Sequence, residues 1–206
     1  MKKSKVLMNK EKLIQEVIEF IEGKIDIKIF YENYKNGKYD KLFDVYLGYE
    51  TIKFRKKKVS DFLNIFNVNT SHHRVCFFNG VEAYLYYEGY SYVPTKKYQE
   101  EWSFRVDIQP SYVLIEDDEI LNKYINEAPE GLKKTEKKKW IKNRIKQDFK
   151  YDKTPPRWVQ DPEWPIVDGI PLVFKKQSKM TLEDERVFYT FYHPETKEET
   201  VVIQFY

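Results

Sequence analysis

Residues 187–206 read VFYTFYHPETKEETVVIQFY, which is two aromatic and β-branched runs on either side of a turn. We expect 187–193 and 200–206 to pair as antiparallel strands around the turn at 194–197. Aromatic and β-branched side chains pack well on a pleated, half-buried surface. The C-terminus therefore predicts an antiparallel, aromatic-rich sheet, with 171–174 as a further strand.

A second hairpin is predicted over residues 74–87. Its arms, 74–78 and 81–87, are strand-like, and Asn79-Gly80 between them supplies the positive φ angles of a type I′ turn. Five other segments have strand patterns: 24–31, 42–47, 51–55, 104–108 and 112–115. We expect all of these strands to form one continuous antiparallel sheet.

Four segments have helical spacing between start and stop signals: 10–22, 60–67, 116–129 and 133–150. Asn9 is the predicted N-cap of the first helix and Gly23 its stop. The predicted fold class is therefore α+β, an antiparallel, aromatic-rich sheet with three to four packed helices. At 206 residues the chain fits a single domain, 1–206, which could divide into an N-terminal subregion, 9–110, and a C-terminal subregion, 150–206.

The charges nearly balance. One third of the residues are charged but the formal net charge is only +3, which argues against a strongly basic nucleic-acid binder and an acidic nucleic-acid mimic. The single cysteine, Cys76, excludes an internal disulfide and a thiolate zinc cluster. No run of eighteen apolar residues is present, so we expect a soluble, cytoplasmic protein without a membrane partner.

The sequence contains no recognisable catalytic motif. His72 and His73 are adjacent, and neighbours on a strand point to opposite faces, so they could bind one metal ion only if they lay in a loop. Neither a GxSxG elbow nor a phosphate-binding glycine loop is present, and the acidic residues 116–119 are typical of a helix start. We therefore predict a protein that is not an enzyme and needs no cofactor or metal.

Surface tyrosines and lysines are the candidate contacts with a partner, because tyrosine buries a large area at low entropic cost and keeps a polar tip. The candidates are Tyr84, Tyr86, Tyr90 and Tyr92, with charges around them from Lys138, Lys142 and Lys146. A different interpretation uses the basic residues of 53–58 and 133–150 to bind phosphates, since the second segment has a net charge of 9 − 2 = +7. Both interpretations predict a macromolecular ligand.

The proline-rich segment 156–165, PRWVQDPEWP, and the following 169–177, GIPLVFKKQ, carry a resemblance to a known family. They match P-x-W-x-Q-x-x-E-x-P and G-x-P-x-x-F-x-x-Q, and the chain here resembles the YwqG-like family of bacterial proteins. The glycine pair that usually opens this loop is replaced by Lys153-Thr154. The resemblance covers about a quarter of the chain and implies a mixed fold without established catalysis, related to immunity proteins that neutralise the toxins of rival bacteria.

The residues of this loop also have a structural interpretation that is independent of the family. Trp158 and Trp164 are expected to pack, Gln160 and Gln177 to bridge backbone groups, and the prolines to hold the chain extended.

The leading hypothesis is a non-enzymatic, protein-binding inhibitor, an immunity protein that neutralises a cognate bacterial toxin by stoichiometric binding. The alternatives are a phage-encoded anti-CRISPR or other anti-defence inhibitor, and a nucleic-acid-binding module that uses the basic helix predicted at 133–150.

Overall fold

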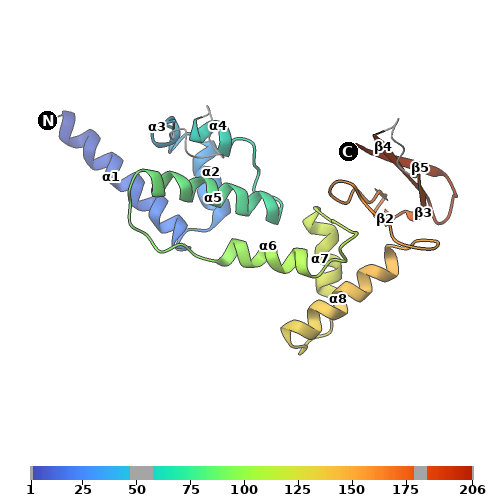
Figure 1. Cartoon of the computed structure of the whole chain (residues 1–206). Helices are drawn as coiled ribbons and strands as arrows, with labels where there is room; N and C mark the ends of the chain where they lie inside the picture. Colours follow the sequence, from blue (N-terminus) through green and yellow to red (C-terminus); the bar gives the residue numbers. More distant parts are fainter. Residues whose placement is uncertain (1, 47–57, 179–184, 206) are drawn as a thin grey trace. The chain divides into compact units, whose positions relative to one another are not determined.

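The computed structural model describes residues 2–46, 58–178 and 185–205, with side chains from Lys10 onward (Figure 1). The chain forms two compact units, Met1–Trp102 and Ser103–Tyr206, and each is described by itself. The described residues contain eight helices and two small antiparallel sheets, which confirms the α+β class. The expectation of a single domain stays a prediction.

Unit 1 is helical. Its elements are α1 (Lys2–Ile21), α2 (Ile27–Lys35), α3 (Asp40–Phe43), α4 (Val59–Leu63), α5 (Ser71–Tyr87) and the first part of α6 (Lys97–Asp107). Aromatic rings fill its core: Phe30 stacks on Phe20 at 4.1 Å and on Tyr39 at 4.6 Å between ring centroids. The short helix predicted at 60–67 is confirmed by α4, although α4 begins at Val59 after the N-cap Lys58 and already ends at Leu63.

Helix α1 ends where the sequence predicts. Gly23 has a φ of 81°, its N–H donates to the carbonyl of Phe20 at 2.9 Å, and the N–H of Lys24 donates to that of Glu19 at 2.8 Å. This is the Schellman arrangement that a left-handed glycine permits. The predicted start was wrong, because α1 already begins at Lys2 and Asn9 lies inside it.

The strand predicted at 24–31 is wrong, because this segment enters α2. The Asp26 side chain caps the helix by accepting from the N–H of Lys28 at 3.0 Å. The helix buries Ile27, Phe30 and Tyr34, which lie three and four residues apart, and leaves Ile29 57% exposed. The apolar residues of this segment fit the period of a helix as well as the two-residue period of a strand. Packing against α1 favours the helix.

The hairpin predicted at 74–87 is also wrong, because this whole segment lies within α5. Thr70 caps the helix by accepting from the N–H of His73 at 3.2 Å. Gly80 lies in the middle of α5 where it packs on α4, and a Cβ there would come within 2.7 Å of Leu63 Cδ2. The glycine of the Asn-Gly pair therefore permits a close helix contact and does not make a turn.

The other strands predicted before residue 116 are not formed in the described residues either. Residues 42 and 43 belong to α3, and 104–107 to α6, where Val106 is 42% exposed and the expected alternation is absent. Residues 112–115 form no strand, although Val113 and Ile115 are buried. The predicted strand 51–55 lies outside the described residues. One continuous sheet is therefore replaced by two small ones.

Unit 2 contains the two predicted helices and all the described strands. Helix α7 (Asp118–Glu127) is capped by Asp117, which accepts from the N–H groups of Glu119 and Ile120 at 2.7 and 3.2 Å. Helix α8 (Lys134–Asp148) buries Ile141 and Ile145 with Phe149 just beyond it, as its apolar seam predicts. Both helix predictions are confirmed.

The C-terminal hairpin is confirmed. The strands are β1 (Ile166–Val167), β2 (Ile170–Pro171), β3 (Val173–Gln177), β4 (Arg186–Tyr192) and β5 (Glu199–Phe205), in a two-stranded sheet β1-β2 and a three-stranded sheet β3-β4-β5. All pairings are antiparallel, and β4 pairs with β5 from Arg186 opposite Phe205 to Tyr192 opposite Glu199. Tyr189 and Phe191 point into the core of unit 2 and make the sheet aromatic-rich, as expected.

Candidate functional site

The predicted partner-binding residues fall in both units. The tyrosines lie in unit 1, on α5 and the segment after it, whereas Lys138, Lys142 and Lys146 lie on α8 of unit 2. They are therefore treated as two separate surfaces. The first, called the tyrosine ridge, consists of Tyr86, Tyr87, Tyr90 and Tyr92.

The helical form of α5 changes which tyrosines are exposed. Tyr84 is only 1% exposed, packs edge-to-face on Phe43 at 5.1 Å, and burial raises its pKa above the usual value. Tyr84 therefore belongs to the core and not to a binding surface. Tyr86 and Tyr87 are 69% and 44% exposed and contact each other edge-to-face at 5.2 Å. Tyr87, which was not among the candidates from the sequence, thus joins Tyr86 on this surface.

The other half of the tyrosine ridge is anchored. After α5 the chain turns, the N–H of Tyr90 donates to the carbonyl of Leu85 at 3.0 Å, and the Tyr92 hydroxyl donates to the carbonyl of Glu82 at 3.3 Å. Both rings are half-buried against the unit 1 core. Burial, and then the charge of Glu82, raise the pKa of Tyr92. The exposed pair therefore lies next to two fixed rings.

The lysines predicted on α8 differ in their surroundings. Lys138 forms an ion pair with Asp107 at 2.5 Å and holds the pKa of that carboxyl below its ordinary value. Lys142 is half-buried, while Lys146 is exposed and lines a pocket with Tyr112. Of the basic stretch predicted at 53–58, only Lys58 is described, and it pairs with Asp44.

Residues 156–165 form an extended loop on the sheet of unit 2. Trp164 is buried and its indole N–H donates to the carbonyl of Leu172 at 2.7 Å. Trp158 is half-buried against Tyr189, with 4.4 Å between ring centroids. The Gln177 side chain bonds both backbone groups of Arg157, accepting from its N–H at 2.7 Å and donating to its carbonyl at 3.4 Å.

A buried glutamine that no sequence pattern distinguishes also holds this loop. Gln204 is fully buried on the inner face of β5; its Oε1 accepts from the N–H groups of Val159 and Gln160 at 3.2 Å each, and its Nε2 donates to the carbonyl of Asp161 at 2.8 Å. Gln160 reaches the other way, donating to the carbonyl of Phe205 at 2.9 Å. The backbone beside Trp158 is thereby fixed to the sheet.

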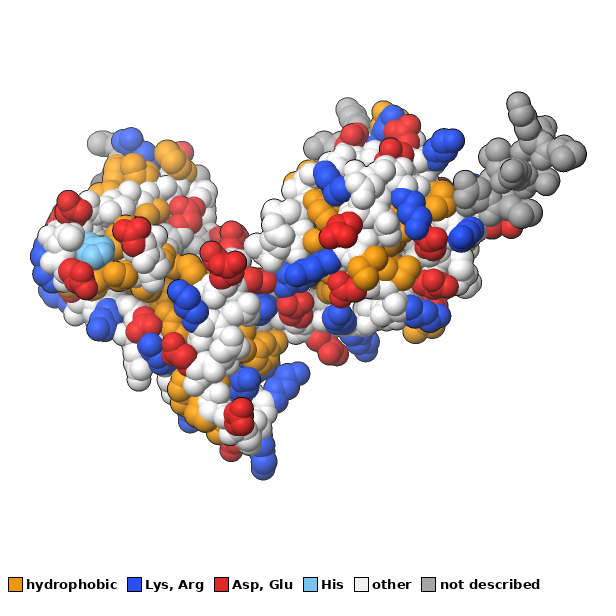
Figure 2. Space-filling model, turned by 180° about the vertical axis from the view of Figure 1, so that it is seen from behind, with side chains coloured by type: hydrophobic (Ala, Val, Ile, Leu, Met, Phe, Trp, Pro, Cys, Tyr) orange, Lys and Arg blue, Asp and Glu red, His pale blue; other side chains and the backbone are white. Residues whose placement is uncertain are grey.

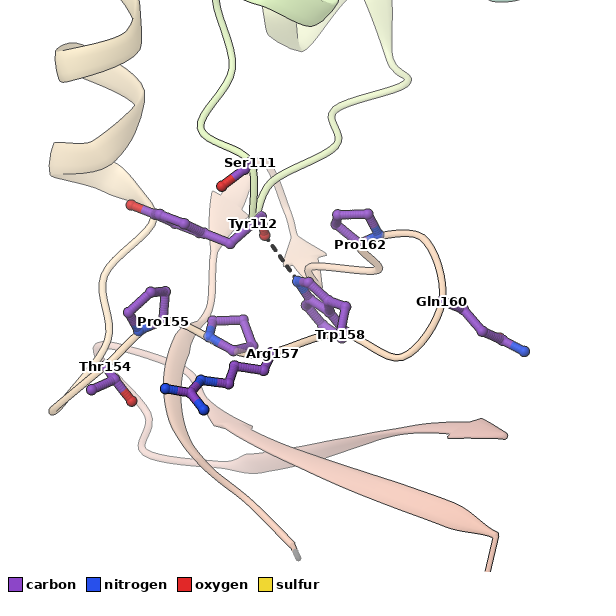
Figure 3. A pocket seen from close by; sticks show the side chains of 9 residues that line it. Ser111, Tyr112, Thr154, Pro155, Arg157, Trp158, Gln160 and Pro162 are labelled. Carbon is purple, nitrogen blue, oxygen red and sulfur yellow. Dashed lines mark hydrogen bonds between the residues drawn. The ribbon is translucent and has the colours of Figure 1, made fainter. Parts of the chain in front are cut away.

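This fixed loop forms one wall of a pocket of about 460 Å³ in unit 2 (Figure 3). Its lining residues are Ser111, Tyr112, Thr154, Pro155, Pro156, Arg157, Trp158, Gln160 and Pro162. Figure 3 shows the ring of Tyr112 above Pro155 and Arg157, whereas Gln160 points away. The indole N–H of Trp158 donates to the carbonyl of Tyr112 at 2.9 Å. This hydrogen bond joins the loop to the segment with Ser111 and Tyr112, which forms the opposite wall.

A second, smaller pocket of about 280 Å³ shares Tyr112 with the first. It is lined by Tyr112, Lys146, Lys150 and Tyr151, and the two tyrosine rings meet edge-to-face at 5.8 Å. The two pockets together are called the Tyr112 groove. Burial, and then the neighbouring Tyr151, raise the pKa of Tyr112, so its phenol is neutral at neutral pH.

The charged residues that line the Tyr112 groove are all cations: Arg157, Lys146 and Lys150. None of the three forms an ion pair with another residue in the described parts of the chain. By contrast, blue and red side chains are interspersed over the face of the molecule drawn in Figure 2. The groove is therefore a local positive site on a protein of nearly balanced charge.

The histidines do not form a metal site in the part of the chain that the structure describes, where no group of three potential ligands occurs. His72 and His73 lie in the first turn of α5, not on a strand, and His72 stacks on Trp102 at 6.1 Å. Among the described helices none is long and apolar enough to cross a membrane.

Comparison with protein-family models, with curated proteins and with solved structures finds no match to this chain. The resemblance of 156–177 to the YwqG-like family therefore stays a prediction.

Proposed function

We propose that this protein is a non-enzymatic inhibitor that binds another protein stoichiometrically, with the tyrosine ridge as its contact surface and a bacterial toxin as the partner. The observation that carries the proposal is the exposure of two adjacent rings, Tyr86 and Tyr87, at 69% and 44%. Exposed tyrosines are typical of the residues that dominate protein interfaces, because ordering a tyrosine side chain on binding costs little conformational entropy.

The surroundings of the pair support this role. Tyr90 and Tyr92 pack on the core of unit 1 in the segment that follows the pair. Since α5 buries eight of its residues between Ser71 and Leu85, the helix that carries Tyr86 and Tyr87 is anchored in the core of unit 1. Binding to such a surface orders few new groups, which favours affinity.

The kind of partner comes from the resemblance of the C-terminal loop to proteins related to toxin immunity. An anti-CRISPR or other anti-defence inhibitor would use the same mechanism, stoichiometric occlusion of an effector. The two differ in the partner, so the partner must be identified to separate them.

The test compares co-purification of the full chain and its variants from bacterial cytosol. Tyr86→Ala with Tyr87→Ala should lose the true partner, and Tyr46→Ala should retain it. Tyr46 is the matched control because it is 66% exposed in the same unit but lies outside the ridge. Loss of one central ring should weaken binding by about 30-fold, equivalent to about 2 kcal/mol.

Titration of the isolated partner then separates the possible modes of inhibition. The proposal requires that inhibition be complete near one equivalent of this protein. Inactivation of many equivalents of partner would show that the protein is an enzyme, and partner binding unchanged by the ridge variants would reject the ridge as the contact surface.

A further inference from the structure

Unit 2 carries a second binding feature that the tyrosine ridge does not explain. The Tyr112 groove contains three rings, Tyr112, Tyr151 and Trp158, and three cations. Tyr151 is 38% exposed, so part of its ring is open to a ligand. An exposed ring beside cations that form no ion pair within the described residues is suited to a ligand that is both planar and anionic.

The carboxylates nearest to Lys150 along the chain are engaged elsewhere. Asp148 accepts from Arg144 at 2.7 Å and from the Tyr124 hydroxyl at 3.0 Å, and Asp152 accepts from the Tyr192 hydroxyl at 3.0 Å. Neither Asp148 nor Asp152 forms an ion pair with Lys150, so the Lys150 ammonium can pair with an external anion.

Each of the two pockets of the Tyr112 groove combines aromatic rings with at least one cation. The larger pocket has Tyr112 and Trp158 with Arg157, and the smaller has Tyr112 and Tyr151 with Lys146 and Lys150. Each nucleotide of a single nucleic-acid strand likewise combines a planar base with a charged phosphate. Bases stack on aromatic rings with little dependence on the nucleotide sequence. An acidic peptide offers charge but no planar group at each step.

We propose that the Tyr112 groove binds single-stranded nucleic acid, with bases against its rings and phosphates on Arg157, Lys146 and Lys150. The rigid loop favours this use, because Gln177 and Gln204 fix the backbone on both sides of Trp158 before any ligand arrives. This site is independent of the tyrosine ridge and of the proposed inhibition, since all its residues lie in unit 2.

The experiment measures the fluorescence anisotropy of a short, dye-labelled oligothymidylate titrated with the full chain. Three phosphate contacts predict a log–log salt slope of about −2 on a single strand, or an affinity about 20-fold lower at 200 mM than at 50 mM salt. Lys146→Glu with Lys150→Glu should weaken binding at least tenfold at low salt and flatten the slope by more than 1.

A matched control reverses the same charge outside the groove. Lys134 and Lys139 are exposed on α8 and line neither pocket, so Lys134→Glu with Lys139→Glu should change affinity by no more than about threefold. Tyr151→Leu should weaken binding by about tenfold through lost stacking and leave the salt slope unchanged. The ridge variant with Tyr86→Ala and Tyr87→Ala should bind the oligonucleotide as the wild type does.

Several outcomes would overturn the proposal. These are no binding at 50 mM salt, equal loss from the groove and control variants, and duplex DNA bound as tightly as the single strand. Polyglutamate bound as tightly as the oligonucleotide would instead identify an acidic protein segment as the occupant, and a mononucleotide bound equally well would limit the site to one nucleotide and refute binding along a strand.

Discussion

Replacement of Gln204 by leucine is expected to destabilise unit 2 by about 3 kcal/mol. Leucine fills a similar volume but cannot bond the loop. The N–H of Val159 would keep the Tyr189 hydroxyl as acceptor at 3.1 Å, whereas the N–H of Gln160 and the carbonyl of Asp161 would lose the bonds they make with Gln204. Two such groups left without partners in a partly buried setting cost about 1 to 3 kcal/mol each.

Gln160→Leu is the matched control. Gln160 makes one exposed side-chain bond, to the carbonyl of Phe205, which water can replace, so its loss should cost no more than about 0.5 kcal/mol. The two variants remove the same chemical group from the same junction of loop and sheet. They differ in burial, since Gln204 is fully buried and Gln160 is exposed.

Urea unfolding followed by tryptophan fluorescence measures the effect, because Trp140, Trp158 and Trp164 all belong to unit 2. With a denaturant slope of about 1.5 kcal/mol per molar, Gln204→Leu should lower the midpoint by about 2 M. A shift below about 0.5 M, or an equal shift for Gln160→Leu, would refute the reasoning that the buried amide holds the loop.

Three further outcomes are expected. Gly80→Leu should lower the free energy of unfolding of unit 1 by about 3 kcal/mol in urea titrations, because even a Cβ there would lie 2.7 Å from Leu63 Cδ2; a cost below 1 kcal/mol would contradict this close packing. Burial raises the pKa of Tyr34 and of Tyr98 from 10.0 to about 12, so the folded state holds these protons more tightly than the unfolded state. Their contribution to stability is complete below pH 10 and is lost as the pH rises toward 12, and urea midpoints that stay constant over this range would disprove it. Asp117→Ala should cost about 1 kcal/mol by removing the cap of α7 while the asparagine variant costs less, and equal costs on thermal unfolding would argue against the cap.

Sequence periodicity predicted unit 2 better than unit 1, for a physical reason. In 187–206 the apolar runs flank a polar turn, and the residues that pair across it are near in sequence, so local preference and final packing agree. In α5 eight of the eleven residues from Phe77 to Tyr87 are apolar or aromatic, and such a run fits a period of two as well as a period of 3.6. The Asn-Gly pair then favoured the wrong alternative.

The candidate surfaces likewise divide into features that local sequence predicts and features that depend on contacts between distant residues. The aromatic and proline pattern of 156–165 was sufficient to predict an extended loop anchored by its tryptophans. Tyr112 was placed on a strand and given no role, and its position beside Trp158 follows from a contact between residues 46 positions apart. No local pattern contains such a contact.

The sequence by itself determined the elements whose signals are short-range: the helix start within the acidic residues 116–119, the stop at Gly23, the apolar seam of α8 and the C-terminal hairpin. Tertiary structure alone decided that Tyr84 is buried and Tyr86 exposed, and that Gln204 holds a loop more than forty residues away in sequence. The reason is that caps and turns are satisfied by groups a few residues apart, whereas burial depends on which distant side chains arrive to exclude water.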